Sequence, residues 1–271
     1  MMRLAGRGLL FAVLFFAVST SVVAEAQQAD IQKVTLSILD DLGIVDLVNN
    51  IPKTMQDGLV QKQQEQGVKR SDYNKKISRV VDRYFARDKI LDFISTDLQS
   101  RFKASRLTTI RRLLDSPAAS ELIKLKIKAR SPQGIEAIRE LAVLHEDSSL
   151  DKEHLSLYEA LDNATADTEF YIATQALSID SIYRINNALN KPQAAPGTDL
   201  LSSTYGLLLR PSKYTTMMTY QFMFANSSVE EIKQYTLIYR QKQMQVLLGR
   251  IMSGLSAAMQ DASEKAIREI D

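Results

Sequence analysis

The residues best suited to acid–base or metal chemistry are gathered in one stretch, HEDSSLDKEH, at positions 145–154. Histidines and acids are the side chains that bind zinc or transfer protons near neutral pH. The two histidines, at its ends, are nine residues apart, which fits neither the i,i+4 pattern nor a zinc-type spacing. Ser148 and Ser149 are suited to N-cap a helix, and Asp151 and Glu153 would lie in its first turn, where the helix dipole favours acids. We therefore interpret the stretch as a junction between helices rather than a metal or catalytic site.

The rest of the sequence contains no recognisable catalytic motif. It has no cysteine, no glycine-rich phosphate loop, no GxSxG and no HExxH pattern. Adjacent acids such as Asp40 and Asp41, or Glu230 and Glu231, point in different directions around a helix and do not form an acid–base dyad. The sequence therefore assigns no catalytic, cofactor-binding or metal-ligating residue and no cofactor, and it favours a non-enzymatic protein.

Two methionine-rich stretches are more suited to a core than to ligand binding. Met244, Met252 and Met259 recur every seven to eight residues with leucine and isoleucine between them, which predicts a buried helix face rather than a copper site. The stretch YTTMMTYQFMF, at 214–224, is apolar on more than one side, which favours burial between helices over a ligand pocket.

A basic segment in the first half of the chain alternates cations with leucine and isoleucine. We expect its cations to form a solvated helix face; the alternative is contact with an anionic partner such as phospholipid head groups. The cations are Arg111, Arg112, Lys124, Lys126, Lys128 and Arg130.

The N-terminus has the pattern of a secretory signal peptide. Arg3 and Arg7 precede an apolar run, Leu9–Val18, and Ala24 and Ala26 supply the small residues of a cleavage site. The run is short for a membrane span, so an uncleaved anchor is the less favoured alternative. Cleavage after Ala26 lowers the formal net charge from +2 to +1, which leaves no charge surplus of the kind that binds nucleic acid. We expect a periplasmic protein that is not integral to the membrane and not lipidated on cysteine.

Hydrophobic residues recur with the period of an α-helix along most of the chain, which predicts an all-α protein. Gly43 is expected to end the first helix, and the Ser116-Pro117 and Ser131-Pro132 pairs indicate an N-cap followed by proline at the first helical position. Tyr205–Leu209 is the one short strand candidate, and Leu189–Ser203 is expected to be the longest loop.

The chain also resembles itself at an offset of 122 residues, the separation of Phe102 and Phe224. The same offset aligns Ile110 with Ile232. We therefore predict two related multi-helix repeats of about 120 residues, packed as a helical bundle array. This divides the chain into a signal peptide at 1–26, a first repeat at 27–147 and a second at 148–271. In the second copy, a capping box is expected at Ser227 and Glu230.

The aligned motif resembles an exported, all-helical bacterial family that is classed only as a domain of unknown function. The first copy has Thr109, Leu113 and Ala119 where the family has glutamate, an aromatic residue and glycine, and the second copy lacks the Ser-Pro pair. The resemblance implies an exported helical protein of a Gram-negative bacterium and assigns no catalytic residue. The matching residues are Phe102, Ser105, Ile110, Ser116 and Pro117 in one copy and Phe224, Ser227, Glu231, Ile232 and Tyr235 in the other.

Three functions are compatible with these patterns. The first is a binding or envelope-support module that takes a protein, peptide or lipid of the cell envelope on apolar helix surfaces or in a groove between the repeats. The second is a hydrolase or lyase of an envelope polymer that uses carboxylates from separate helices. The third is an oligomeric structural protein that associates through the 214–224 stretch.

Overall fold

The computed structural model describes residues 29–65, 70–144, 152–190 and 199–270, and every regular element in these ranges is an α-helix. The all-α prediction is therefore confirmed, while the predicted signal peptide and the junction stretch up to residue 151 lie outside the described residues. Residues 29–41 are helical. They are followed by α2 (Ile44–Asn49), α3 (Ile51–Glu65), α4 (Arg70–Tyr84), α5 (Arg87–Arg101), α6 (Ala104–Leu114), α7 (Pro117–Arg130), α8 (Pro132–Leu144), α9 (Lys152–Thr165), α10 (Asp167–Asn190), α11 (Asp199–Met223), α12 (Val229–Tyr239) and α13 (Lys242–Ile270).

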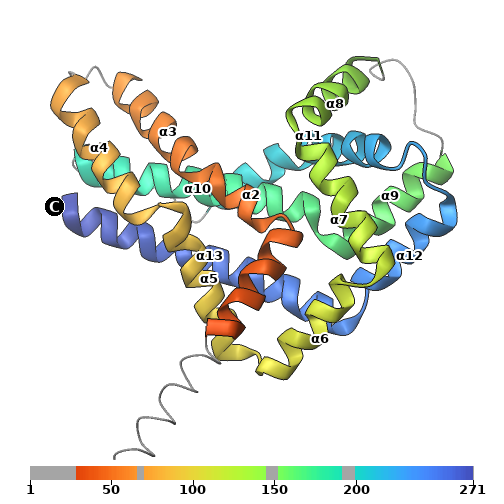
Figure 1. Cartoon of the computed structure of the whole chain (residues 1–271). Coiled ribbons are helices and arrows are strands. Elements are labelled where there is room, and N and C mark those ends of the chain that lie inside the picture. The colour runs from red at the N-terminus through yellow and green to blue at the C-terminus, as the bar shows by residue number, and fades with distance from the viewer. Residues whose placement is uncertain (1–28, 66–69, 145–151, 191–198, 271) are drawn as a thin grey trace, which may run out of the picture.

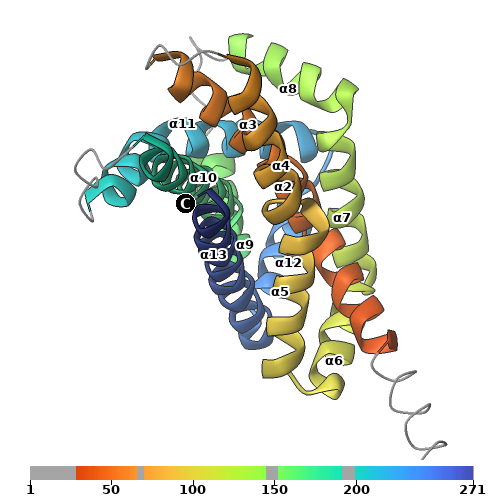
Figure 2. The same cartoon turned by 90° about the vertical axis from the view of Figure 1, so that its left-hand side faces the viewer.

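Two long helices, α10 and α13, lie side by side and cross the whole molecule (Figure 1). α10 also packs against α3 and α11, and α13 packs against α4 and α5. Seen along the direction of Figure 2, α10 and α13 lie on one side of the molecule and α5 and α7 on the other. Among the described residues, no helix combines the length and the apolar character that a bilayer span requires.

One hydrophobic core runs through both halves of the chain. The predicted burial is confirmed for Met244 and Met259, which are fully buried in α13, and for Met217, Met218 and Met223 in α11, whereas Met252 is only partly buried. The 214–224 stretch therefore packs within its own chain, and an oligomer could not use these methionines as a free interface.

The α10–α11 region differs from the prediction. Tyr205–Leu209 is helical, so the strand prediction is wrong, and α10 and α11 leave only residues 191–198 of the expected Leu189–Ser203 loop outside a helix. Leucine is a strong helix former, and a run of five residues is too short to separate the period of a strand from that of a helix.

The predicted cap positions are confirmed at α7 and α8 and displaced at α12. Ser116 stands at the N-cap position before Pro117, but its hydroxyl donates to the Leu113 carbonyl at 2.6 Å and does not cap α7. The Ser131 hydroxyl accepts a hydrogen bond of 3.0 Å from the Gly134 amide at the start of α8. In α12 the capping box is formed by Ser228 and Glu231, not by Ser227 and Glu230. The sequence has a serine three residues before a glutamate in both registers, so the pattern alone could not select between them.

Ser228→Ala should lower the free energy of unfolding by about 1 kcal/mol, because the Glu231 amide loses its side-chain acceptor. Urea unfolding followed by circular dichroism measures this difference. Ser227→Ala is the matched control and should stay within about 0.5 kcal/mol of the wild type. Equal losses in the two variants would contradict the register of the box.

Two residues among those described have a left-handed backbone, and both stand between consecutive helices. Gly43 (φ 79°) follows the helical residues 29–41, and Ala166 (φ 57°) separates α9 from α10. A side chain at Gly43 would be strained by the backbone and would overlap the Arg130 guanidinium. These turns direct α2 and α10 toward the same region of the molecule.

Candidate functional site

A groove of about 570 Å³ opens between α2, α7, α8, α10 and α11. It joins helices from both halves of the chain, and its volume lies in the range of small-molecule sites. Its charged lining consists of Asp46, Lys126, Arg130 and Asp167, its hydroxyl lining of Ser212, Thr215, Thr216, Thr219 and Tyr220, and the larger apolar residues include Phe170, Tyr171, Met223, Ile135 and Ile138.

An ion pair between a buried lysine and a partly exposed aspartate forms part of the wall of this groove. The Lys126 ammonium lies 2.7 Å from both carboxylate oxygens of Asp167; the Lys126 side chain is 5% exposed and the Asp167 side chain is 26% exposed. The Tyr220 hydroxyl donates a 2.7 Å hydrogen bond to Asp167 Oδ2 and lies 2.9 Å from Thr165 Oγ1. We call Lys126, Asp167 and Tyr220 the polar cluster.

The burial of Lys126 corrects the prediction that the basic segment forms a solvated face. Lys124 and Lys128 are exposed as expected, but Lys126 lies on the same helix face as Leu122 and Ala129, both buried. The spacing of three and four residues places it in the core, where its charge requires the Asp167 carboxylate. The alternation of cations and apolar residues hid this, because it has the two-residue period of a strand and not the period of a helix.

The pKa values of the polar cluster follow from burial and pairing. Burial alone would raise the pKa of Asp167, but the Lys126 ammonium and the Tyr220 hydroxyl outweigh it, and the pKa lies below its ordinary value. Burial lowers the pKa of Lys126 despite the opposing effect of Asp167. Burial also raises the pKa of Tyr220 well above its ordinary value, so the phenol stays protonated and keeps its donor. The cluster is a fixed set of donors and acceptors near neutral pH.

Two further carboxyl groups flank the start of α10 outside the groove lining. Burial raises the pKa of Asp162, whose Oδ1 accepts a 3.0 Å hydrogen bond from the Thr168 amide. Burial, together with the charges of Asp162 and Asp167, also raises the pKa of Glu169. Its Oε2 is buried and has no hydrogen-bond partner among the described residues.

Glu169→Gln should make the fold less sensitive to pH. An acid with a raised folded pKa contributes stability below its unfolded value, near 4.5, and this contribution is lost as the pH rises through the raised value. We therefore expect the variant to gain stability relative to the wild type between about pH 4 and about pH 7. Urea unfolding midpoints at the two pH values test this.

The control for this measurement is Glu153→Gln, which removes an exposed acid from the first turn of α9. Its stability relative to the wild type should change less between the two pH values. A Glu169→Gln difference that is the same at both pH values would contradict the assignment.

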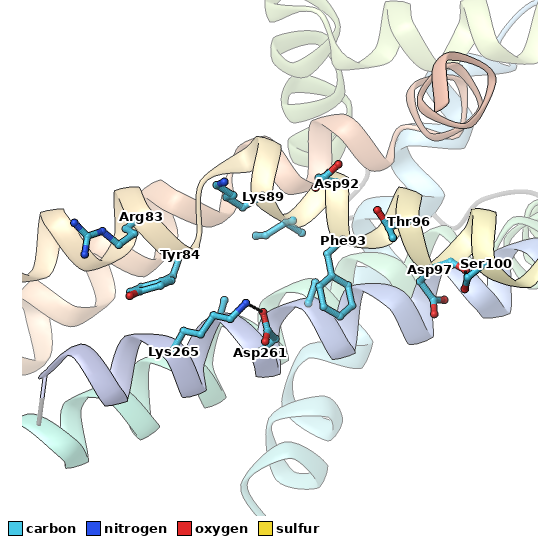
Figure 3. Close-up of a pocket in the computed structure, with 13 residues that line it drawn as sticks. Arg83, Tyr84, Lys89, Asp92, Phe93, Thr96, Asp97, Ser100, Asp261 and Lys265 are labelled. Carbon is cyan, nitrogen blue, oxygen red and sulfur yellow. Dashed lines mark hydrogen bonds and ion pairs between the residues drawn. The ribbon is translucent and has the colours of Figure 1, made fainter. Parts of the chain in front are cut away.

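A second groove, of about 520 Å³, lies between α4, α5 and α13. Figure 3 shows Phe93 of α5 directed toward α13, where Lys265 and Asp261 form an ion pair of 2.7 Å. Both members of this pair are largely solvent-exposed, as is Thr96 on α5. This groove has surface charges along its edge, whereas the first has the ion pair of a buried lysine in its wall, and we therefore select the first as the candidate site.

His154 is not among the residues that line either groove. His154 lies on α9 with its ring centroid 6.2 Å from that of Tyr158, while His145 is outside the described residues. Across the described ranges, no group of three or more histidines and acids is arranged to hold a metal ion. The sequence patterns singled out Lys126 and the 214–224 stretch but did not predict that Lys126, Asp167 and Tyr220 meet. The spacing of Lys126 to Leu122 and Ala129 is the one feature of the sequence that indicates its burial.

Comparison with known proteins adds no relative: no protein-family model, no curated protein and no solved structure matches this chain.

Proposed function

We propose that this chain is an exported, non-enzymatic binding module of the bacterial cell envelope, and that the groove between α2, α7, α8, α10 and α11 holds its ligand. The observation that carries this proposal is the Lys126–Asp167 pair in the wall of an open groove, in which the lysine is buried and the aspartate is partly exposed. Burying a charge costs several kcal/mol, and well-packed apolar residues usually serve stability as well or better. A polar wall at that cost is suited to recognition of a ligand.

The rim of the groove supports the same function. Ile135 of α8 is 50% exposed and Tyr171 of α10 is 43% exposed, although both line the groove. A bound molecule with an apolar part would cover them and remove that surface from water, which stabilises the complex by about 25 cal/mol for each Å² buried.

We also infer that the two halves derive from one five-helix unit, as the sequence offset predicts. The first helix of each half is residues 29–41 and α9, and the fourth is α6 and α12. The other three positions hold two helices in the first half and one in the second: α2 and α3 correspond to α10, α4 and α5 to α11, and α7 and α8 to α13. Each pair of short helices in the first half corresponds to a single long helix in the second. The left-handed residues Gly43 and Ala166 occupy the same place in the two halves, directly after the first helix.

Packing between the halves supports this inference because it is reciprocal. α13 of the second half packs on α4 and α5 of the first, and α7 and α8 of the first half pack on α11 of the second. α3 packs on α10, its own counterpart. With this correspondence, the two grooves are related: each lies between the third helical segment of one half and the fifth of the other.

Native mass spectrometry of the protein purified from a periplasmic extract tests the proposed function. We expect a mass excess that disappears on denaturation, and we expect Thr219→Trp, which fills the groove from α11, to abolish it. The matched control is Thr96→Trp, which places the same bulk in the groove between α5 and α13 and should retain the excess.

A wild-type protein that is free of ligand, or an excess that survives Thr219→Trp and disappears in Thr96→Trp, would overturn the assignment of the groove. Multiples of the chain mass without bound ligand would favour a self-assembling structural protein instead. Turnover of an envelope polymer would favour the enzymatic alternative.

A further inference from the structure

The polar cluster draws Lys126 from the first half of the chain and Asp167 and Tyr220 from the second, and each of the three has an apolar counterpart in the opposite half. Asp167 is the first residue of α10, and Ile44 is the first residue of α2. Tyr220 lies four residues before Phe224, whose amide bonds to the Tyr220 carbonyl at 2.9 Å, and Leu98 has the same relation to Phe102 at 2.8 Å.

The third member of the cluster follows the same rule. Lys126 is the tenth residue of α7, and Ile251 is the tenth residue of α13. Ile44, Leu98 and Ile251 are all buried in the hydrophobic core. The three helix positions are therefore charged or polar in the cluster, whereas their counterparts, Ile44 and Leu98 in the first half and Ile251 in the second, are apolar.

This difference indicates that the fold itself does not require charged or polar residues at these three positions. Apolar residues at the three counterpart positions pack into the common core, so the helical arrangement does not require an ion pair at these positions. Replacement of a buried ion pair by apolar residues is often neutral or stabilising. Contact with a ligand would explain why the Lys126–Asp167 pair lies in the wall of the groove between α2, α7, α8, α10 and α11.

The charges that line the groove are balanced. Lys126 pairs with Asp167, and Arg130 Nη1 lies 3.1 Å from Asp46 Oδ2. An ionised head group in the groove would meet a like charge in each pair and would lose its own hydration. An uncharged head group can instead donate to Asp167 and accept from Lys126.

Hydroxyl groups extend this polar surface along α11. Ser212, Thr215, Thr216 and Thr219 line the groove at helical spacing, and Thr216 Oγ1 accepts a 2.9 Å hydrogen bond from Thr168. The Thr215 and Thr219 hydroxyls donate to the backbone carbonyls of Pro211 and Thr215, so their lone pairs remain as acceptors for the hydroxyl groups of a sugar or glycerol. The apolar lining, with its exposed rim residues, matches an alkyl or acyl chain.

We propose that the polar cluster is the recognition element of this groove and that its ligand is an uncharged amphiphile with a hydroxyl-rich head and an aliphatic chain. This inference rests on the proposed function, since it specifies the ligand of the same groove. The head lies against Lys126, Asp167 and the α11 hydroxyls, and the chain lies against Phe170, Met223 and the rim.

Isothermal titration calorimetry with amphiphiles of one chain length tests the ligand class. The probes are decyl maltoside and monodecanoylglycerol, with uncharged heads, and decanoate and decyltrimethylammonium, with charged heads, all below their micelle concentrations. We expect at least one uncharged probe to bind about tenfold tighter than either charged probe, equivalent to about 1.4 kcal/mol. Which of the two uncharged probes binds tighter distinguishes a sugar head from a glycerol head.

The role of the polar cluster is tested with the triple variant Lys126→Ile, Asp167→Ile and Tyr220→Leu, which places at each position the residue of its counterpart, Ile251, Ile44 or Leu98. It should retain the thermal midpoint of the wild type and lose the preference for an uncharged head. Tyr220→Phe removes one hydroxyl without altering the ring and should lose part of that preference, which keeps the test informative if the triple variant does not fold.

The outcomes separate this inference from the proposed function. If a charged probe binds as tightly as the uncharged ones and Thr219→Trp abolishes binding, the ligand class is overturned while the groove remains the site. If the variants keep the wild-type preference, the cluster is not the recognition element. If no probe binds and the exported protein carries no ligand, the proposed function fails as well.

Discussion

Lys126→Met should lower the free energy of unfolding by about 3–5 kcal/mol. The methionine side chain fills a similar volume, but it leaves the Asp167 carboxylate without the ammonium that lies 2.7 Å from both its oxygens. The Tyr220 hydroxyl is then the one remaining donor that the described structure gives this carboxylate. Urea unfolding at neutral pH, with the m-value compared between the proteins, measures the loss.

The matched control for this loss is Lys124→Met, two residues earlier on the same helix. The Lys124 side chain is 69% exposed and pairs only with Glu121 of its own helix at 3.3 Å, so this change should cost about 0.5 kcal/mol or less. The apolar triple variant should be about as stable as the wild type or more stable, since no charge is left unpaired. Losses of equal size in Lys124→Met and Lys126→Met would show that the Asp167 pair is solvated.

Phe224→Ala should cost about 3–5 kcal/mol, as is usual for a fully buried phenylalanine. Phe224 follows α11, and its ring packs against three tyrosines, with centroids 5.9 Å from Tyr158, 5.8 Å from Tyr220 and 5.8 Å from Tyr235. These rings come from α9, α11 and α12, so truncation opens a cavity where three helices meet. The thermal midpoint and the urea midpoint should both fall.

Phe222→Ala is the control for the aromatic cluster. Its half-buried ring has the Lys128 ammonium 5.6 Å from its centroid and belongs to none of the ring pairs around Phe224. Its loss should be clearly smaller, because a partly exposed site collapses or fills with water instead of leaving an empty cavity. A Phe222→Ala loss as large as that of Phe224→Ala would argue that ring size, not the cluster, sets the cost.

The helical character of the chain could be predicted from sequence because it depends on neighbours three and four residues apart. The apolar period identified the buried methionine face of α13, and local chemistry placed the starts of α7 and α8 at Pro117 and Pro132. Where two registers had the same chemistry, as at Ser227 and Ser228, the pattern was ambiguous by one residue, and only the three-dimensional path of the chain decides between them.

The polar cluster could be predicted only in part. The position of Lys126 on an apolar helix face can be read from its spacing to Leu122 and Ala129. Its partner cannot, because Asp167 is 41 residues further along the chain and Tyr220 is 53 residues beyond that. An acid at the first position of a helix is ordinary in sequence, since the helix dipole favours it there. The pairing arises only when α7 packs beside α10 and α11.

α13 covers helices that precede it by many residues in the chain. Its 29 residues pack on α4, α5 and α10, and all three are synthesised before it. The apolar faces of those helices therefore stay without this partner until α13 itself has been synthesised, so this part of the core closes late in folding.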